Sequence, residues 1–322
     1  MTGDFGDLAF VWPGDSWVDI RNRVGTDPIC RVAAWPMVLE CDVLGWDGTA
    51  ARHVPKARLR NYRVLLVNVF NESRHVEQIR AAHPGAFIIA MPDPYLEIVL
   101  YDETPRLLEQ LAHADAIGGR TQYDVAVYGA LLGQPAVWLP SPVGPTDAFR
   151  TIWNEPKRDV LLAVDHHWFP NSSAATAAAL AAIQRENGAS VHWYGASDKT
   201  RRVAKLAGLR AEWRERIPYA EMVRETARAR WGVDLYAGHA QGRNLLTHAM
   251  AGTPVVGSCT NNPAGAVAVE PYAPQEAAEQ VLAAWDGARY EVHRQRAFEY
   301  VEAVYGFDAS RRRMAETLGA LL

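Results

Sequence analysis

Residues 233–257 read VDLYAGHAQGRNLLTHAMAGTPVVG, and this stretch decides the fold. Val233 to Tyr236 is a short apolar run of the kind that forms a buried parallel strand. Leu245 to Ala251 has the composition of a helix, and Gly252 stands where a glycine commonly ends one. The run from Thr253 to Gly257 then starts another strand. The stretch therefore predicts a strand, a loop, a helix and a second strand.

The loop inside this stretch, Gly238 to Asn244, carries two glycines and several polar side chains. It leads directly into the N-terminus of the predicted helix. In α/β folds, phosphates and nucleotides bind where a polar loop follows the carboxyl end of a parallel strand and enters a helix. The loop is therefore the first candidate for a ligand site.

Strand and helix signals alternate along the rest of the chain, which predicts an α/β fold with parallel sheets covered on both faces. In the second half the predicted strands are 158–165, 189–195, a segment within 209–217, and 266–269. The predicted helices there are 172–186, with Ser172 or Ser173 as N-cap, 199–207, 219–229 and 274–285. In the first half the predicted strands are 9–12, 62–70, 86–91, 116–118 and 135–140, and the predicted helices are 73–82, 104–114 and 124–132.

Prolines concentrate between residues 140 and 156 and mark a linker. We therefore expect an N-terminal Rossmann-like domain at 1–150 and a C-terminal one at 151–300. A C-terminal helix at 301–322 is predicted, and one interpretation is that it packs back on the N-terminal domain. A chain of 322 residues is long enough for two such domains.

The composition argues against several classes of protein. Hydrophobic residues are 49% and charged residues 22% of the chain, as in soluble globular proteins, and the net charge of −4 gives no general attraction to nucleic acid or anionic membranes. Cys30, Cys41 and Cys259 have no metal-ligand spacing and fit free thiols in a reducing compartment. We recognise no signal peptide or membrane-spanning stretch, so a cytoplasmic location is expected.

Several motifs give the second half a resemblance to the donor domain of retaining GT-B glycosyltransferases. They are Trp193-Tyr194-Gly195 at the end of a strand, Ile217 to Met222 opening a helix, and the stretch from Gly242 to Gly257, which is the most specific. In the first half, Met91-Pro92-Asp93 stands where such enzymes place a His-Asp after a strand. The resemblance covers most of residues 60–310. It implies a GT-B fold, in which two Rossmann-like domains have parallel sheets facing a central cleft.

The same resemblance implies an activity. A hexose would be transferred from a nucleoside-diphosphate sugar, UDP-glucose or a similar donor, to a hydroxyl acceptor, without a metal and with retention of configuration. Many members of this family carry two glutamates in an E-x7-E arrangement, and the second glutamate holds the donor ribose. This chain has Ala240 and His248 at the corresponding positions, so the donor is held differently here or the usual chemistry has changed.

The donor is expected to lie against strand ends and helix starts of the second half. Arg243 and Asn244 can supply N–H donors to phosphate. His248 can hydrogen-bond a ribose hydroxyl, and its alternative role is that of a core or helix-face histidine. The other predicted donor-binding residues are His166, His167, Gly195, Pro218, Tyr219, His239, Gly242 and Leu245. The histidines have no recurring metal-ligand spacing, so a zinc site is a poor alternative and no metal or other cofactor is expected.

Asp93 is the candidate catalytic carboxylate. It follows the predicted strand 86–91, so it should lie at the carboxyl end of that strand and opposite the donor domain. There it could position or deprotonate an acceptor hydroxyl. The alternative is a structural role as the N-cap of a segment that begins with Pro94.

The predicted acceptor-binding residues are Trp12, Asp15, Trp17, Arg58 and Arg60. The tryptophans can stack on a sugar or a base, although core packing is the commoner use of this residue. The arginines belong to a basic cluster at 52–63. That cluster is either a solvated loop or a contact for an acceptor that carries phosphate, such as DNA with hydroxymethylated bases. A saccharide or another small molecule is the other class of acceptor.

Two functions of other classes are kept as alternatives. A nucleotide-sugar epimerase with the same fold would isomerise the sugar nucleotide without any acceptor. A non-catalytic nucleotide-sugar binding protein would account for the missing motif glutamates. No motif in the chain identifies the sugar, the acceptor or the oligomeric state.

Overall fold

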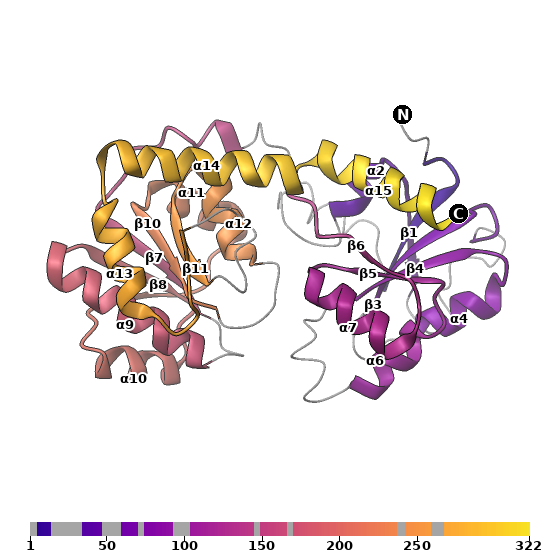
Figure 1. Ribbon diagram of the computed structural model, residues 1–322, viewed down its shortest axis with the longest axis horizontal. Coiled ribbons are helices and arrows are strands. Elements are labelled where there is room, and N and C mark those ends of the chain that lie inside the picture. Colours follow the sequence, from indigo (N-terminus) through magenta and orange to yellow (C-terminus); the bar gives the residue numbers. More distant parts are fainter. Residues whose placement is uncertain are drawn as a thin grey trace. The chain divides into compact units, whose positions relative to one another are not determined.

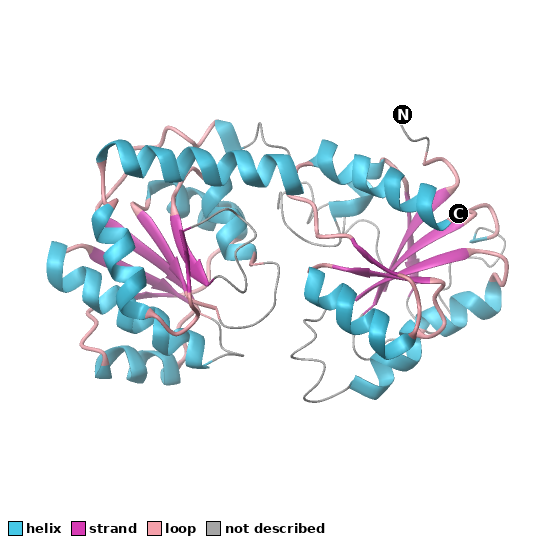
Figure 2. Cartoon of the chain, viewed as in Figure 1, coloured by secondary structure: helices cyan, strands magenta, loops and turns pink. Residues whose placement is uncertain are grey.

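The computed structural model describes residues 5–13, 34–46, 59–69, 74–92, 104–144, 149–165, 170–236, 242–258 and 267–322. The chain divides into two compact units, each with its own six-stranded sheet. Unit 1 comprises Met1–Gly144 and Tyr305–Leu322, and unit 2 comprises Pro145–Val304. In Figures 1 and 2 each sheet carries helices on both faces, as expected for parallel strands that are buried on both sides.

The sheet of unit 1 is parallel throughout and has the strand order β2-β1-β3-β4-β5-β6. Its strands are β1 (Leu8–Pro13), β2 (Asp42–Trp46), β3 (Val64–Val69), β4 (Phe87–Pro92), β5 (Ala116–Gly119) and β6 (Ala136–Trp138). Every residue of the central strand β3 is buried, which its near-continuous apolar sequence predicts.

Helices cover the two faces of this sheet. On one face α4 (His75–Ala82), α6 (Thr104–Leu111) and α7 (Gln122–Leu132) pack against apolar side chains of β3 and β4. On the other face lie α2 (Trp35–Leu39) and α15 (Phe307–Leu321), which contact each other. Met314 of α15 is completely buried among residues of β1, β3 and β4, so the last helix completes the core of unit 1.

The sheet of unit 2 is also parallel, in the order β12-β11-β10-β7-β8-β9. Its strands are β7 (Val160–Val164), β8 (Ser190–Tyr194), β9 (Glu212–Arg214), β10 (Trp231–Asp234), β11 (Val255–Ser258) and β12 (Val267–Val269). Its helices are α9 (Pro170–Asn187), α10 (Asp198–Leu206), α11 (Tyr219–Arg228), α12 (Arg243–Met250), α13 (Pro274–Ala283) and α14 (Gly287–Tyr305). The chain builds outward from β7 to β9 and then starts again on the other side of β7, so the strand order reverses between β7 and β10.

Two details of unit 2 differ from the sequence-based predictions. Strand β10 begins at Trp231, two residues before the predicted start, because Trp231 and Gly232 are both buried in the sheet. Helix α9 begins at Pro170, so Ser172 and Ser173 lie inside the helix and the prediction of an N-cap there was wrong. The helix-ending role of Gly252 is confirmed, since its φ is +66° directly after the C-cap residue of α12.

Among the described residues, no helix is long and apolar enough to cross a membrane.

Candidate functional site

The carboxyl edge of the unit 2 sheet is where its topology favours a ligand. In open α/β sheets, ligands bind at the carboxyl ends of the strands where the strand order reverses. Here that position lies between β7 and β10. The backbone N–H of Leu235, directly after β10, donates to Thr176 Oγ1 of α9 at 3.1 Å, which ties the end of β10 to the helix that follows β7.

Helix α12 begins close to this edge. Its N-cap, Gly242, is buried and has a φ of +68°, a conformation that glycine adopts without strain. Leu245 packs closely on β11, because a Cβ added to Gly257 would lie 2.7 Å from its Cδ2 atom. The first N–H groups of a helix have no partner within the helix and attract anions. The backbone N–H groups of Arg243 and Leu245 are therefore candidates for binding a phosphate.

Gly195, directly after β8, provides a second element of the edge. Its φ is +68°, and its N–H donates to the carbonyl oxygen of Arg214 at 2.8 Å. The exposed Arg216 side chain lies against it, since a Cβ at Gly195 would come within 2.8 Å of Arg216 Nε. Because Gly195 has no side chain, the Arg216 side chain can lie directly against its backbone. Arg216 was not among the predicted site residues, because its proximity to Gly195 depends on the register of β8 and β9.

Two hydroxyl groups meet between α11 and α12. Pro218 is the N-cap of α11, and Tyr219 is its first residue. The Tyr219 hydroxyl and Thr247 Oγ1 are 2.9 Å apart. Thr247 was also missed by sequence reasoning, since a threonine within a helix carries no signal of its own. Thr247 lies on α12 itself, about one helical turn after its first residue, Arg243.

The buried carboxylate of Asp165 connects several elements at this edge of the sheet. Asp165, directly after β7, accepts hydrogen bonds from Ser173 Oγ at 3.1 Å and from Thr200 Oγ1 at 2.7 Å. Its second oxygen accepts from the backbone N–H of Ser197 at 3.0 Å. One side chain thus connects the end of β7 to α9 and to the start of α10. Ser173, expected as an N-cap, serves instead as one of these donors.

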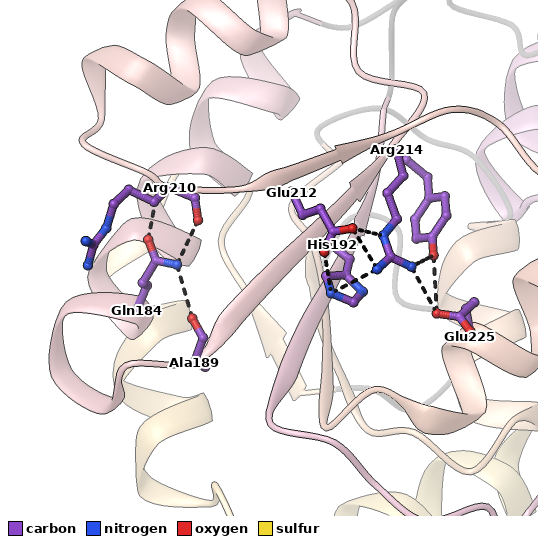
Figure 3. Close-up of polar contacts among 8 residues, drawn as sticks. Gln184, Ala189, His192, Arg210, Glu212, Arg214 and Glu225 are labelled. Carbon is purple, nitrogen blue, oxygen red and sulfur yellow. Dashed lines mark hydrogen bonds and ion pairs between the residues drawn. The ribbon is translucent and has the colours of Figure 1, made fainter.

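Arg214 links the ends of β8 and β9 to α11 (Figure 3). Its guanidinium contacts Glu212 at 2.9 Å and Glu225 at 3.3 Å, and it donates to the Tyr194 hydroxyl at 3.0 Å. The same hydroxyl donates to Glu225 at 3.4 Å. These contacts fix Tyr194 and hence the backbone that leads into Gly195.

His192 faces the same cluster, and its Nε2 atom lies 3.2 Å from Glu212 Oε2 (Figure 3). Burial lowers the pKa of His192, and the adjacent Arg214 cation lowers it further, against the opposing effect of Glu212. Burial also raises the pKa of Tyr194, so its hydroxyl keeps its proton at neutral pH. The cluster has the chemistry of a positioning network rather than of an acid–base pair.

His248 lies in the core of unit 2. Its ring packs on β10, since a Cβ at Gly232 would be 2.2 Å from its Cδ2 atom, and its Nδ1 atom is 2.7 Å from the Asn244 carbonyl oxygen. Burial lowers its pKa, so the ring is neutral. This geometry favours the role of a packed core histidine, and the role in ribose binding stays a prediction without support from the side chain's position.

Several predicted site residues lie outside the described residues: Asp15, Trp17, Arg58, Asp93, His166, His167 and His239. Of Arg243 only the backbone is described. Trp12 is at the carboxyl end of β1, whereas Arg60 precedes the amino end of the parallel strand β3. The structure therefore does not bring Trp12 and Arg60 together in one acceptor site.

In the part of the chain that is described, no group of three or more His, Cys, Asp or Glu side chains could hold a metal ion.

Each unit has a parallel six-stranded sheet covered by helices, as in solved glycosyltransferase structures, which confirms the α/β architecture of the GT-B class expected from the sequence. Trehalose-6-phosphate synthase OtsA aligns with a TM-score of 0.69 and 10% identity, over 98% of this chain and all (100%) of that one. An E. coli structure described as trehalose-6-phosphate bound with UDP-2-fluoro glucose gives 0.67 and 11%, over 97% and 98% of the two chains. Sucrose-phosphate synthase from Thermosynechococcus elongatus gives 0.64 and 15%, over 98% and 99%. No protein-family model and no curated protein sequence matches the chain.

Proposed function

We propose that this protein is a glycosyltransferase that binds a nucleoside-diphosphate hexose on unit 2 and transfers the sugar to a hydroxyl acceptor. The observation that carries the proposal is the arrangement at the carboxyl edge of that sheet, where the N-terminus of α12 and the Gly195–Arg216 pair flank the reversal of strand order. The fold shared with sugar-phosphate synthases supports it, as does the UDP-sugar bound in one of them.

The donor site has to bind the two phosphates and the ribose of the nucleotide. Two phosphates need positive potential and N–H donors as the bond to the sugar breaks, and the helix N-terminus and Arg216 supply these without a metal. The hydroxyls of Tyr219 and Thr247, which are 2.9 Å apart, are proposed to bind the ribose. Asp93 is proposed to orient or deprotonate the acceptor hydroxyl, and retention of configuration is proposed from the resemblance alone.

The acceptor is proposed to be a saccharide or another small molecule. Of the basic cluster at 52–63, the described residues include Arg60 and Arg63, both exposed and both on the amino side of β3. Nothing in this position favours a DNA acceptor over a small one.

Isothermal titration with UDP, GDP and their glucose conjugates tests the proposal. We expect one of the diphosphates to bind, and Arg216→Ala to weaken that binding about ten- to a hundredfold, the cost of a hydrogen bond to a charged group. Arg210→Ala is the matched control, because this exposed arginine precedes β9 and should leave the affinity unchanged.

The outcomes separate the competing functions. Absence of binding by all four compounds at millimolar concentration would rule out the donor site. Isomerised sugar nucleotide in the absence of acceptor would identify an epimerase. Tight binding without any hydrolysis or transfer would identify a binding protein.

A further inference from the structure

Asn68 lies at the carboxyl edge of the unit 1 sheet. It is the penultimate residue of the central strand β3, is completely buried, and pairs with Met91 of β4. Because side chains alternate along a strand, Asn68 shares a face with Leu66. The register that pairs Val11 with Val67 places Trp12 of β1 beside it. A buried amide thus lies between an aromatic ring and a thioether side chain at this edge.

The amide of Asn68 has no hydrogen-bond partner within the described residues, at either Oδ1 or Nδ2. In the same part of the chain, no other buried side chain has two polar atoms in this state. Leaving a buried polar group unsatisfied costs about 1–3 kcal/mol, and native proteins pair nearly all such groups. Near the end of an apolar strand, an amide of this kind therefore calls for a partner that the described residues do not supply.

The main chain at this position is held firmly. His75 Nε2 lies 2.6 Å from the Asn68 carbonyl oxygen, and the ring is buried. Burial lowers the pKa of His75 to about 4, so the neutral ring donates its Nε2–H to that carbonyl at physiological pH. The backbone of Asn68 is thus satisfied and fixed while its side-chain amide is not. The unsatisfied side-chain amide of Asn68 therefore lies on a strand end whose backbone is fixed by a hydrogen bond.

We infer that the Asn68 amide, together with Trp12, binds a vicinal diol of a hexose-class substrate on unit 1. A primary amide offers N–H donors beside a carbonyl acceptor, which complements two neighbouring hydroxyls that each donate and accept. The half-buried Trp12 ring, which stacks on Phe10 with ring centroids 6.2 Å apart, adds an aromatic face for the C–H side of the sugar. Only one part of this inference rests on the proposed function, namely that the bound sugar is the acceptor.

Replacement of Asn68 separates ligand binding from a structural role. Asn68→Leu keeps the size of the side chain and removes both unsatisfied atoms, so its melting temperature should equal or exceed that of the wild type. Gln110→Leu is the matched control. Gln110 is a buried amide of α6 whose Oε1 accepts from the backbone N–H of Glu77 at 3.4 Å, so its loss should lower the melting temperature.

Ligand binding is measured with D-glucose as the probe, by the shift in melting temperature with UDP present at a fixed concentration. We expect D-glucose to stabilise the wild type and Gln110→Leu, and its effect to fall at least tenfold in apparent affinity in Asn68→Leu. UDP affinity should stay within twofold in all three proteins, because UDP is assigned to unit 2.

Three results would overturn the inference: an equal glucose shift in wild type and Asn68→Leu, no glucose shift in the wild type, or a loss of stability in Asn68→Leu as large as in Gln110→Leu. Failure of UDP to bind the wild type contradicts the proposed function instead. In that case the stability comparison and the glucose titration without UDP still decide the role of Asn68.

Discussion

Gly232 and His248 occupy one small space between β10 and α12. The motif around His248 gives its place along the chain but not the direction of its side chain, which depends on how α12 packs on the sheet. A glycine in β10 is what lets the imidazole approach the strand backbone. The sequence therefore identifies the helix correctly, while the role of its histidine follows only from the packing.

Gly232→Ala should be strongly destabilising for this reason. The new Cβ would lie 2.4 Å or less from the Nε2 and Cδ2 atoms of His248, and overpacking of this kind typically costs about 1–3 kcal/mol. Chemical denaturation measures the loss of unfolding free energy. His248→Ala in the same protein should restore part of it, and additive effects of the two substitutions would contradict the packing seen here.

Lys157 should make the stability of the protein depend on pH. Burial, reinforced by nearby Arg294, lowers the pKa of its ammonium group from 10.5 to about 7, while Nζ donates to Thr253 Oγ1 at 2.8 Å. Between these two pH values the folded lysine is neutral and the unfolded one is charged, so unfolding takes up a proton. The free energy of unfolding should therefore rise as the pH increases from about 7 towards 10.

Lys157→Met removes this titration and should flatten the profile. Urea unfolding at intervals between these pH values measures both proteins. Parallel profiles for wild type and variant would show that Lys157 is not the group responsible.

At the scale of elements, apolar runs bounded by glycine and proline predict most of the helices and strands, because parallel strands buried on both faces leave a strong signal. β3 and β7 are examples. β2 was not predicted, since Asp42–Trp46 is a short strand at the sheet edge. At the candidate site, glycines such as Gly195 and Gly242 could be predicted from their places in the motifs. Arg216 and Thr247 could not, because their partners come from other elements.

Replacing Asp165 tests whether the contacts between β7, α9 and α10 support the donor site. Asp165→Asn keeps the shape but replaces one carboxylate oxygen with a donor, so one of its three hydrogen bonds is lost. We expect a loss of about 1.5–3 kcal/mol in unfolding free energy and weaker nucleotide binding, since the starts of α9 and α10 are no longer held together. Asp198→Asn, at an exposed position of α10, is the control and should have a small effect on both measurements. Unchanged nucleotide affinity in Asp165→Asn would separate this network from the site.

At the scale of the whole molecule, the last helix belongs to the first unit. Met314→Ala should cost about 2–5 kcal/mol, because Met314 is completely buried in the unit 1 core. Hydrogen-exchange mass spectrometry should show faster exchange in β1, β3 and β4, with β7 and β10 of unit 2 unchanged. Met222→Ala, in an apolar cluster of unit 2, should give the converse pattern. Equal acceleration in both units would show that they unfold as one.

The return of the chain to unit 1 also decides when the core of that unit can be completed during synthesis. Strands β1 to β6 leave the ribosome well before residues 305–322, and all of unit 2 is synthesised in between. Unit 2 can therefore complete its core during translation, while one face of the first sheet waits for α15. Because α2 covers only part of that face, the apolar surface that α15 covers later stays exposed during this interval, and exposed surface of this kind favours aggregation of the nascent unit.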